Sequence, residues 1–222
     1  MGNTIRLTAG DGHQLDAYQA DPDGAPKGAI VIIQEIFGVN SHIRSVCDGY
    51  AADGYVAIAP ALFDRVERGI ELGYVEPDMG RGRETRGKLS WDGALADVSA
   101  AAAAVKSAGK VAVVGYCYGG SVAWLAATRL DFAAVVSYYG GNVAEFAEEQ
   151  PKCPVILHIG DQDKAIDAGK IETIKNAQPD IPVYIYQGAG HGFNCEQRGS
   201  FHQEATKVAR GRTLEFLAEH IG

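Results

Sequence analysis

The sequence predicts an α/β fold in which helices cover both faces of a mostly parallel sheet of about eight strands. Three observations support this prediction. Residues 28–34 (GAIVIIQ) form a continuous apolar run, which is typical of a strand buried on both faces. From there to the C-terminus, strand-like runs alternate with helical segments. The 222 residues, 46% hydrophobic and 22% charged, suit one globular core, so we expect a single domain over residues 1–222.

The N-terminal elements are predicted as a hairpin, a strand, a helix and a second strand. The hairpin is indicated by the turn dipeptide Asp11-Gly12 between two stretches that partly alternate apolar and polar residues. Ser41 is placed to cap the helix, and Pro60 ends the second strand. The expected ranges are 4–8 and 13–20 for the hairpin, 28–34 and 55–59 for the strands, and 41 to about 53 for the helix.

The rest of the chain continues the alternation after one irregular segment. Residues 60–88 hold five Gly and five Arg without clear periodicity, so we expect a long loop there, and loops of that length tend to be functional. The other predicted elements are helices at 91–107, 119–129, 167–177 and 203–220, and strands at 110–115, 133–137, 155–159 and 183–186.

Charge and cysteine content exclude several classes of function. The formal net charge of −8 argues against a nucleic-acid partner. No apolar run reaches about 18 residues, and the first residues show no secretory signal, so we expect a cytoplasmic protein that does not enter a membrane. The four cysteines form no CxxC pair, which argues against a zinc ribbon or a thioredoxin-type site. We expect neither a metal nor an organic cofactor.

The most informative local motif is Gly115-Tyr116-Cys117-Tyr118-Gly119. It follows the strand-like run VAVV and opens the helical run SVAWLAA, as a nucleophile elbow requires. The central thiol would then lie at a helix N-terminus, where the helix dipole favours the thiolate. Taken alone, the same residues also fit a core cysteine between flanking glycines.

A nucleophile needs a base, and His191 is the best placed of the six histidines. It lies in the loop GAGHGF directly after the strand-like run VYIYQ, although a plain loop histidine would fit there too. His158 is expected in the core. The remaining histidines are expected at the surface or at helix caps: His13, His42, His202 and His220.

An acid should orient the imidazole, and Asp161 or Asp163 follows the strand-like run VILHI, with Asp167 a weaker candidate. The order of nucleophile, acid and base along the chain is then that of α/β-hydrolases.

The loop QEIFGVN follows the first buried strand. In such a fold this loop supplies one amide of an oxyanion hole, and the residue after the nucleophile supplies the other. By position these are the backbone N–H groups of Ile36 and Tyr118. Glu35 is either a solvated loop acid or a partner that governs the protonation state of Cys117.

Together, QEIFGVN, GYCYGG, GDQD and GAGHGFN resemble the dienelactone hydrolase (carboxymethylenebutenolidase) family of α/β-hydrolases. The resemblance covers nearly the whole chain with its motifs in order. It implies an α/β-hydrolase fold and a catalytic triad of Cys117, Asp163 and His191, and it favours Asp163 over Asp161. It also implies that Glu35 contacts the resting thiol and helps to generate the thiolate when substrate binds.

The resemblance further implies that two arginines hold a substrate carboxylate. Arg83 best matches the first, with Arg81 as an alternative. At the position of the second stands Cys195, so Arg198 would have to serve from a shifted loop.

The expected reaction is hydrolysis of an enol-lactone or carboxylic ester through a thioester on Cys117, and the expected partner is a small, anionic lactone or ester. Tyr138 and Tyr139 are candidates for lining the pocket or for packing. A generalist carboxylesterase or thioesterase is the main alternative, and a catalytically silent binding module is a second. We expect a monomer or a weak homo-oligomer.

Overall fold

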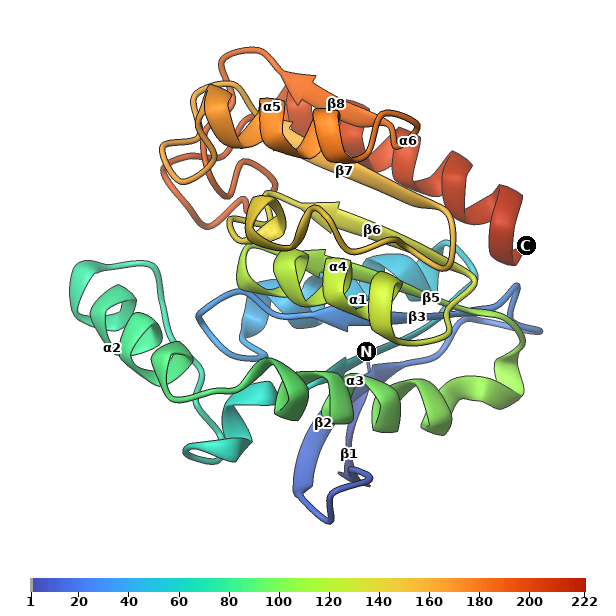
Figure 1. The fold of residues 1–222 in the computed structure, drawn as a ribbon. Helices are drawn as coiled ribbons and strands as arrows, with labels where there is room; N and C mark the ends of the chain where they lie inside the picture. The colour runs from blue at the N-terminus through green and yellow to red at the C-terminus, as the bar shows by residue number, and fades with distance from the viewer. Residues whose placement is uncertain (1) are drawn as a thin grey trace.

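The computed structural model describes residues 2–222 and contains a single eight-stranded sheet with the strand order β1-β2-β4-β3-β5-β6-β7-β8 (Figure 1). The strands β3 to β8 run parallel to one another, whereas β1 and β2 pair antiparallel at one edge. The predicted fold class is therefore confirmed. The strands are β1 (Asn3–Thr8), β2 (Gln14–Ala20), β3 (Ala29–Ile33), β4 (Val56–Pro60), β5 (Val111–Tyr116), β6 (Ala134–Tyr138), β7 (Val155–Gly160) and β8 (Val183–Tyr186).

Helices cover both faces of this sheet. In Figure 1, α3, α4 and α5 lie in front of the strands, and α1 and α6 lie behind them. The central strands β3, β5 and β6 are buried along nearly their whole length, as the apolar run at 28–34 predicted. The helices are α1 (Ser41–Ala52), α2 (Glu76–Gly87), α3 (Trp91–Val105), α4 (Tyr118–Arg129), α5 (Ala168–Ala177) and α6 (Gln203–Ile221), with short 3-10 turns at Leu62–Arg65, Lys106–Ala108 and Val143–Phe146.

The helix α2 corrects the expectation of a loop throughout residues 60–88. Its sequence, EPDMGRGRETRG, has no apolar stripe and buries only Gly82 and Thr85, so periodicity could not reveal it. Its ends nevertheless suit a helix, because a proline and two acidic residues stand in the first turn and Arg86 stands in the last.

The cap of α1 is a second correction. Asn40, and not Ser41, is the N-cap residue, and its side-chain oxygen accepts a hydrogen bond of 3.3 Å from the backbone N–H of Ile43. Ser41 is the first residue inside the helix.

None of the helices in residues 2–222 combines the length and the apolar character that crossing a membrane would require.

Candidate active site

Cys117 lies on a sharp turn between β5 and α4. Its backbone is in the left-handed region, with φ of 55°, and its N–H donates to the carbonyl of Tyr138 at 3.0 Å. The flanking glycines permit this turn. A Cβ on Gly119 would lie 2.3 Å from the carbonyl oxygen of Ile33, and one on Gly115 would lie 1.9 Å from that of Gly119. The motif therefore forms the strained strand–helix turn that a nucleophile elbow requires.

The structure brings Cys117, His191 and Asp163 into a hydrogen-bonded row. The Nε2 atom of His191 lies 3.0 Å from Sγ of Cys117, and its Nδ1 atom lies 2.8 Å from Oδ2 of Asp163. The other carboxylate oxygen of Asp163 accepts the backbone N–H of Ala165 at 2.8 Å. These residues follow β5, β8 and β7, whose parallel carboxyl ends meet at one edge of the sheet. Of the three acid candidates, Asp163 is the one bonded to His191.

The charges in this row favour a protonated imidazole. Burial lowers the pKa of His191, but the charges of Cys117 and Asp163 and the hydrogen bonds to them outweigh burial and raise it to about 10. The ring nitrogen Nε2 lies 3.0 Å from the sulfur, within reach to exchange a proton with it. The arrangement is therefore that of a thiol with an adjacent, carboxylate-oriented base.

Glu35 and Arg198 form a buried ion pair beside this row. The guanidinium Nη1 of Arg198 donates to Oε1 of Glu35 at 3.0 Å, and the two side chains are 15% and 1% exposed. Burial lowers the pKa of Arg198, but the charges of Glu35 and Cys117 outweigh it and raise that pKa. Arg198 thus reaches the site from the loop after β8, as the sequence allowed for a shifted arginine.

The two candidate oxyanion residues lie at the same edge of the sheet. Tyr118 follows Cys117 as the first residue of α4, and Ile36 follows Glu35 in the loop after β3. The strands β3 and β5 are neighbours, with Ile33 paired to Gly115 at their ends. The backbone of α2 covers this loop so closely that a Cβ on Gly82 would lie 2.1 Å from the carbonyl oxygen of Ile36.

The predicted arginines of the segment 60–88 point elsewhere. Arg81 bonds to Glu67 at 2.8 Å, and Arg83 lies 3.7 Å from Glu76, with both side chains half exposed. The structure does not bring either into contact with the Cys117 row.

Sequence reasoning missed a third arginine of the same helix, Arg86. Its guanidinium lies over the rings of Trp91 and Tyr118, at 4.2 and 4.5 Å from their centroids. It therefore contacts the residue that follows Cys117. The available signal was the repetition of arginine in this segment, but nothing in the sequence singled out this one.

Tyr138 lies in the core and not in the site. Its hydroxyl is bonded to that of Thr213 at 2.7 Å, and its ring packs on Tyr116 and His158. Its neighbour Tyr139 has a left-handed backbone, with φ of 40°, and its ring centroid lies 5.2 Å from that of His191. The change of backbone conformation after β6 thus turns Tyr139 toward the site in place of Tyr138.

Two histidines outside the row also have defined surroundings. His158 is in the core as expected, with its ring nitrogens 2.7 Å from the hydroxyl of Tyr186 and 3.1 Å from that of Thr213. His42, expected at the surface or at a cap, is instead buried at 6% exposure in the first turn of α1, against Glu35 and Cys195.

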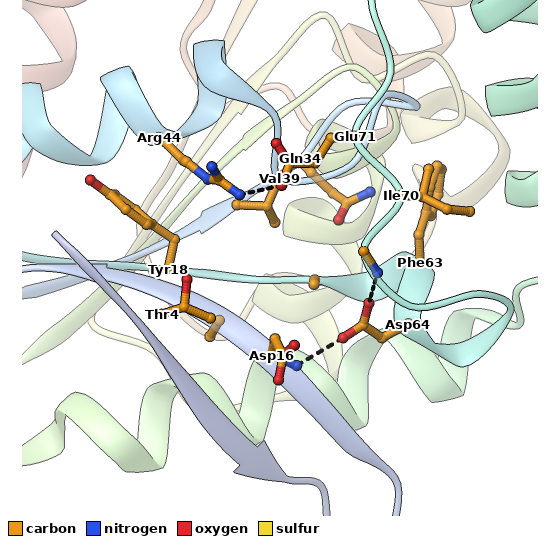
Figure 2. Close-up of a pocket in the computed structure, with 13 residues that line it drawn as sticks. Thr4, Asp16, Tyr18, Gln34, Val39, Arg44, Phe63, Asp64, Ile70 and Glu71 are labelled. Atoms are coloured by element: carbon orange, nitrogen blue, oxygen red, sulfur yellow. Dashed lines mark hydrogen bonds and ion pairs between the residues drawn. The ribbon is translucent and has the colours of Figure 1, made fainter.

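A separate cavity of about 240 Å³ lies between β2 and the segment that follows β4 (Figure 2). Its acidic residue Asp64 accepts the backbone N–H groups of Asp16 at 2.9 Å and Gly69 at 3.1 Å, and Arg44 pairs with Glu71 at its wall. Because Asp64, Arg44 and Glu71 are already bonded within the protein, we do not assign a catalytic role to this cavity.

Comparison with known proteins finds one family and several similar structures. The family model described as "Dienelactone hydrolase family" matches residues 15–221. The chain is 34% identical over 227 residues to the carboxymethylenebutenolidase of Pseudomonas putida, covering 96% of this chain and 95% of that protein. A provisionally assigned dienelactone hydrolase of Klebsiella pneumoniae has a similar structure, with a TM-score of 0.84, 29% identity and coverage of 98% and 99% of the two chains. The Pyrococcus furiosus esterase Pf2001 shares the fold, with a TM-score of 0.73 at 15% identity, over 100% of this chain and 93% of that chain.

Proposed function

Because the chain belongs to the dienelactone hydrolase family of hydrolases, we propose that it cleaves an enol-lactone or a carboxylic ester through Cys117, His191 and Asp163. One observation carries this proposal: a single imidazole lies 3.0 Å from the thiol sulfur and 2.8 Å from a buried carboxylate. That geometry is what covalent catalysis by an activated thiol requires. The named relative from Pseudomonas putida supports the lactone as the substrate class.

The first half of the reaction acylates the enzyme. The thiolate of Cys117 attacks the carbonyl carbon, an S–C bond forms, and the electron pair of the C=O bond moves to the oxygen. The backbone N–H groups of Ile36 and Tyr118 donate hydrogen bonds to that oxyanion. The intermediate then collapses, the C–O bond to the leaving group breaks, and the leaving oxygen takes a proton from the imidazolium of His191.

The second half hydrolyses the thioester. His191, now neutral and oriented by Asp163, removes a proton from water as the water oxygen attacks the thioester carbonyl. Collapse of this second intermediate breaks the S–C bond and releases the carboxylic acid. The sulfur leaves as thiolate and His191 is again protonated, so the starting state is restored.

The leaving group bears on the class of substrate. The raised pKa of His191 depends first on the charge of Cys117, and that charge is lost once the sulfur has bonded to the carbonyl carbon. An enol-lactone leaves as a stabilised enolate and needs little protonation, so it suits a thiol nucleophile.

An anionic substrate would be attracted chiefly by two arginines. Arg198 lies within the buried part of the site, and Arg86 lies over the ring of Tyr118. We assign them the role of holding a substrate carboxylate, with Glu35 as the group that releases Arg198 and contacts the thiol. Arg81 and Arg83 each pair with a glutamate at the surface, so we rank them below Arg198 and Arg86 for binding the substrate carboxylate.

The test compares kcat/KM for cis- and trans-dienelactone with that for p-nitrophenyl acetate. We expect a clear preference for a dienelactone, and loss of turnover on both substrates in Cys117→Ala with an unchanged melting temperature. Activity retained by Cys117→Ala would contradict the mechanism. A strong preference for the neutral ester would instead indicate a generalist carboxylesterase. Arg198 would then stay bonded to Glu35 and would not bind a substrate carboxylate.

A further inference from the structure

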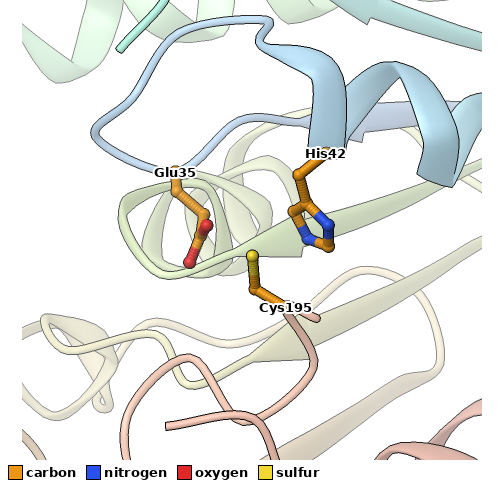
Figure 3. A group of neighbouring side chains, drawn as sticks. All are labelled: Glu35, His42 and Cys195. Atoms are coloured by element: carbon orange, nitrogen blue, oxygen red, sulfur yellow. The ribbon is translucent and has the colours of Figure 1, made fainter. Parts of the chain in front are cut away.

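The side chains of Glu35, His42 and Cys195 point toward one another (Figure 3). They come from the loop after β3, the first turn of α1 and the loop after β8. One ligand atom of each, an oxygen, a nitrogen and a sulfur, lies within 4.8 Å of the others. The residues are 1%, 6% and 0% exposed.

Two polar atoms of this cluster are left without partners. Within residues 2–222, neither Oε2 of Glu35 nor Nε2 of His42 has a hydrogen-bond partner, although both atoms are buried. Buried polar groups in native structures are nearly always satisfied, so such atoms call for a ligand or an ion. The ion pair with Arg198 uses only Oε1 of Glu35, so it leaves Oε2 available.

We propose that Glu35, His42 and Cys195 bind a zinc ion. Carboxylate oxygen, imidazole nitrogen and thiolate sulfur are the donors that Zn²⁺ takes in proteins, and three protein ligands leave a fourth position for water. In tetrahedral coordination such ligand atoms lie roughly 3.5 Å apart, so a contraction of about 1 Å from their present spacing completes the site. One thiolate and one carboxylate balance the charge of the ion, and the guanidinium of Arg198 on Oε1 of Glu35 leaves the group with one positive charge.

Zinc binding here displaces the thiol proton of Cys195: an S–Zn bond replaces the S–H bond, and the proton passes to the buffer. The titratable and charged groups that face the cluster are Glu196, Arg198, Tyr74 and Tyr139.

A route to the cluster exists from the surface. A groove of about 470 Å³ lies between α1 and the segment after β8, and His42, Asn194 and Glu196 are among its lining residues. The carboxylate of Glu196 is positioned to attract a cation at this entrance.

Zinc at this site would inhibit hydrolysis. The ion would hold Glu35 away from its role toward Cys117 and Arg198, so this consequence rests on the function proposed above, whereas binding itself does not. The proposed zinc site would therefore inhibit the activity proposed for Cys117 and His191.

Zinc binding is measured by calorimetric titration of Cys117→Ala protein with Zn²⁺, because this background removes the competing Cys117–His191 pair. We expect one ion per chain and a loss of affinity of at least ~100-fold on adding Cys195→Ser or His42→Gln. Adding Cys153→Ser, which removes a half-buried thiol elsewhere, is the matched control and should leave affinity unchanged. Co²⁺ as a probe should show a thiolate-to-metal charge-transfer band that Cys195→Ser abolishes.

Unchanged zinc affinity in both the Cys195→Ser and the His42→Gln proteins would overturn the proposal. So would binding by wild-type protein that Cys117→Ala alone eliminates, because the ion would then sit on the catalytic pair. Inhibition is followed separately with p-nitrophenyl acetate, where Cys195→Ser should raise the half-inhibiting zinc concentration at least ~10-fold. Loss of turnover in Cys117→Ala tests the proposed function without any metal, so the two can fail independently.

Discussion

Arg198 donates a hydrogen bond of 3.0 Å to Glu35, a residue 163 positions away in the sequence. The contact joins the loop after β8 to the loop after β3, and it places one positive and one negative charge beside Cys117. The carboxylate of Glu35 is 1% exposed, so its charge depends on Arg198, which is itself 15% exposed. We therefore expect the Glu35–Arg198 pair to stabilise the fold as well as to take part in substrate binding.

Replacing Arg198 with Gln should lower both stability and activity on anionic substrates. Glu35 would be left as a buried charge without its partner, which costs about 3 kcal/mol in the free energy of unfolding. Denaturant unfolding measures this cost, and KM for a dienelactone should rise much more than KM for p-nitrophenyl acetate. Adding Glu35→Gln should recover part of the lost stability.

Arg83→Gln is the matched control for this prediction. Its side chain is half exposed and 3.7 Å from Glu76, so its loss should change the free energy of unfolding by no more than about 0.5 kcal/mol. If Arg83→Gln raised KM for the lactone more than Arg198→Gln did, the assignment of Arg198 to the substrate carboxylate would be wrong.

Iodoacetamide should alkylate Cys117 selectively. Cys117 is partly exposed and its sulfur lies 3.0 Å from His191, so it should be the first of the four thiols to react at pH 7. Burial raises the pKa of Cys153 to about 11, so that thiol should react only at much higher pH. Peptide mapping by mass spectrometry after brief labelling at neutral pH measures the selectivity.

Asp163→Asn tests whether selective alkylation of Cys117 depends on the charge of His191 or only on the exposure of the thiol. Without the carboxylate the pKa of His191 falls, because one of the charges that raise it is gone. Alkylation at pH 7 should then slow by roughly 10-fold or more. Equal labelling of all four cysteines in the wild type would instead favour a catalytically silent binding protein.

The short motifs made much of the fold and the triad residues predictable. Cys117, Asp163 and His191 each follow a strand directly, so their place at one edge of a parallel sheet follows from local sequence and chain order. Whether they catalyse is a question for the variants above. The position of Arg198 against Glu35 could not be derived in this way, because it depends on how two distant loops fold over the sheet.

Other features lacked any local signal. The helix α2 has no apolar face, so its existence and the contact of Arg86 with Tyr118 were hidden. Tyr138 and Tyr139 could not be told apart, because neighbouring residues at a strand end point to opposite sides and the left-handed backbone of Tyr139 is set by packing. The burial of His42 likewise depends on the loop that carries Cys195.

Acid should destabilise the protein in part through His158. Burial lowers its pKa to about 3 from an ordinary value of 6.5, so below pH 6.5 the unfolded state binds a proton that the folded state excludes. The folded state is not penalised above pH 6.5, and it loses up to roughly 5 kcal/mol in the free energy of unfolding as pH falls toward 3. Urea unfolding at several pH values should show a shallower decline for His158→Gln than for wild type. If the free energy of unfolding fell equally steeply with pH in both proteins, His158 would have the same pKa in the folded and unfolded states.

Gly119→Ala should prevent the elbow from forming. The new Cβ would lie 2.3 Å from the carbonyl oxygen of Ile33 and 2.6 Å from that of Gln34, and backbone atoms at these positions cannot move without shifting β3. We expect a loss of at least about 3 kcal/mol in the free energy of unfolding, with turnover lost in whatever folds.

Gly211→Ala is the opposite case, because Gly211 lies inside α6 with nothing within 4 Å of its Cβ position. There the substitution should stabilise the protein by roughly 0.5–1 kcal/mol, since alanine loses less backbone entropy in a helix. Thermal unfolding of the two variants measures both effects. Equal effects at both positions would contradict the close approach of β3 to the elbow as the reason for glycine at 119.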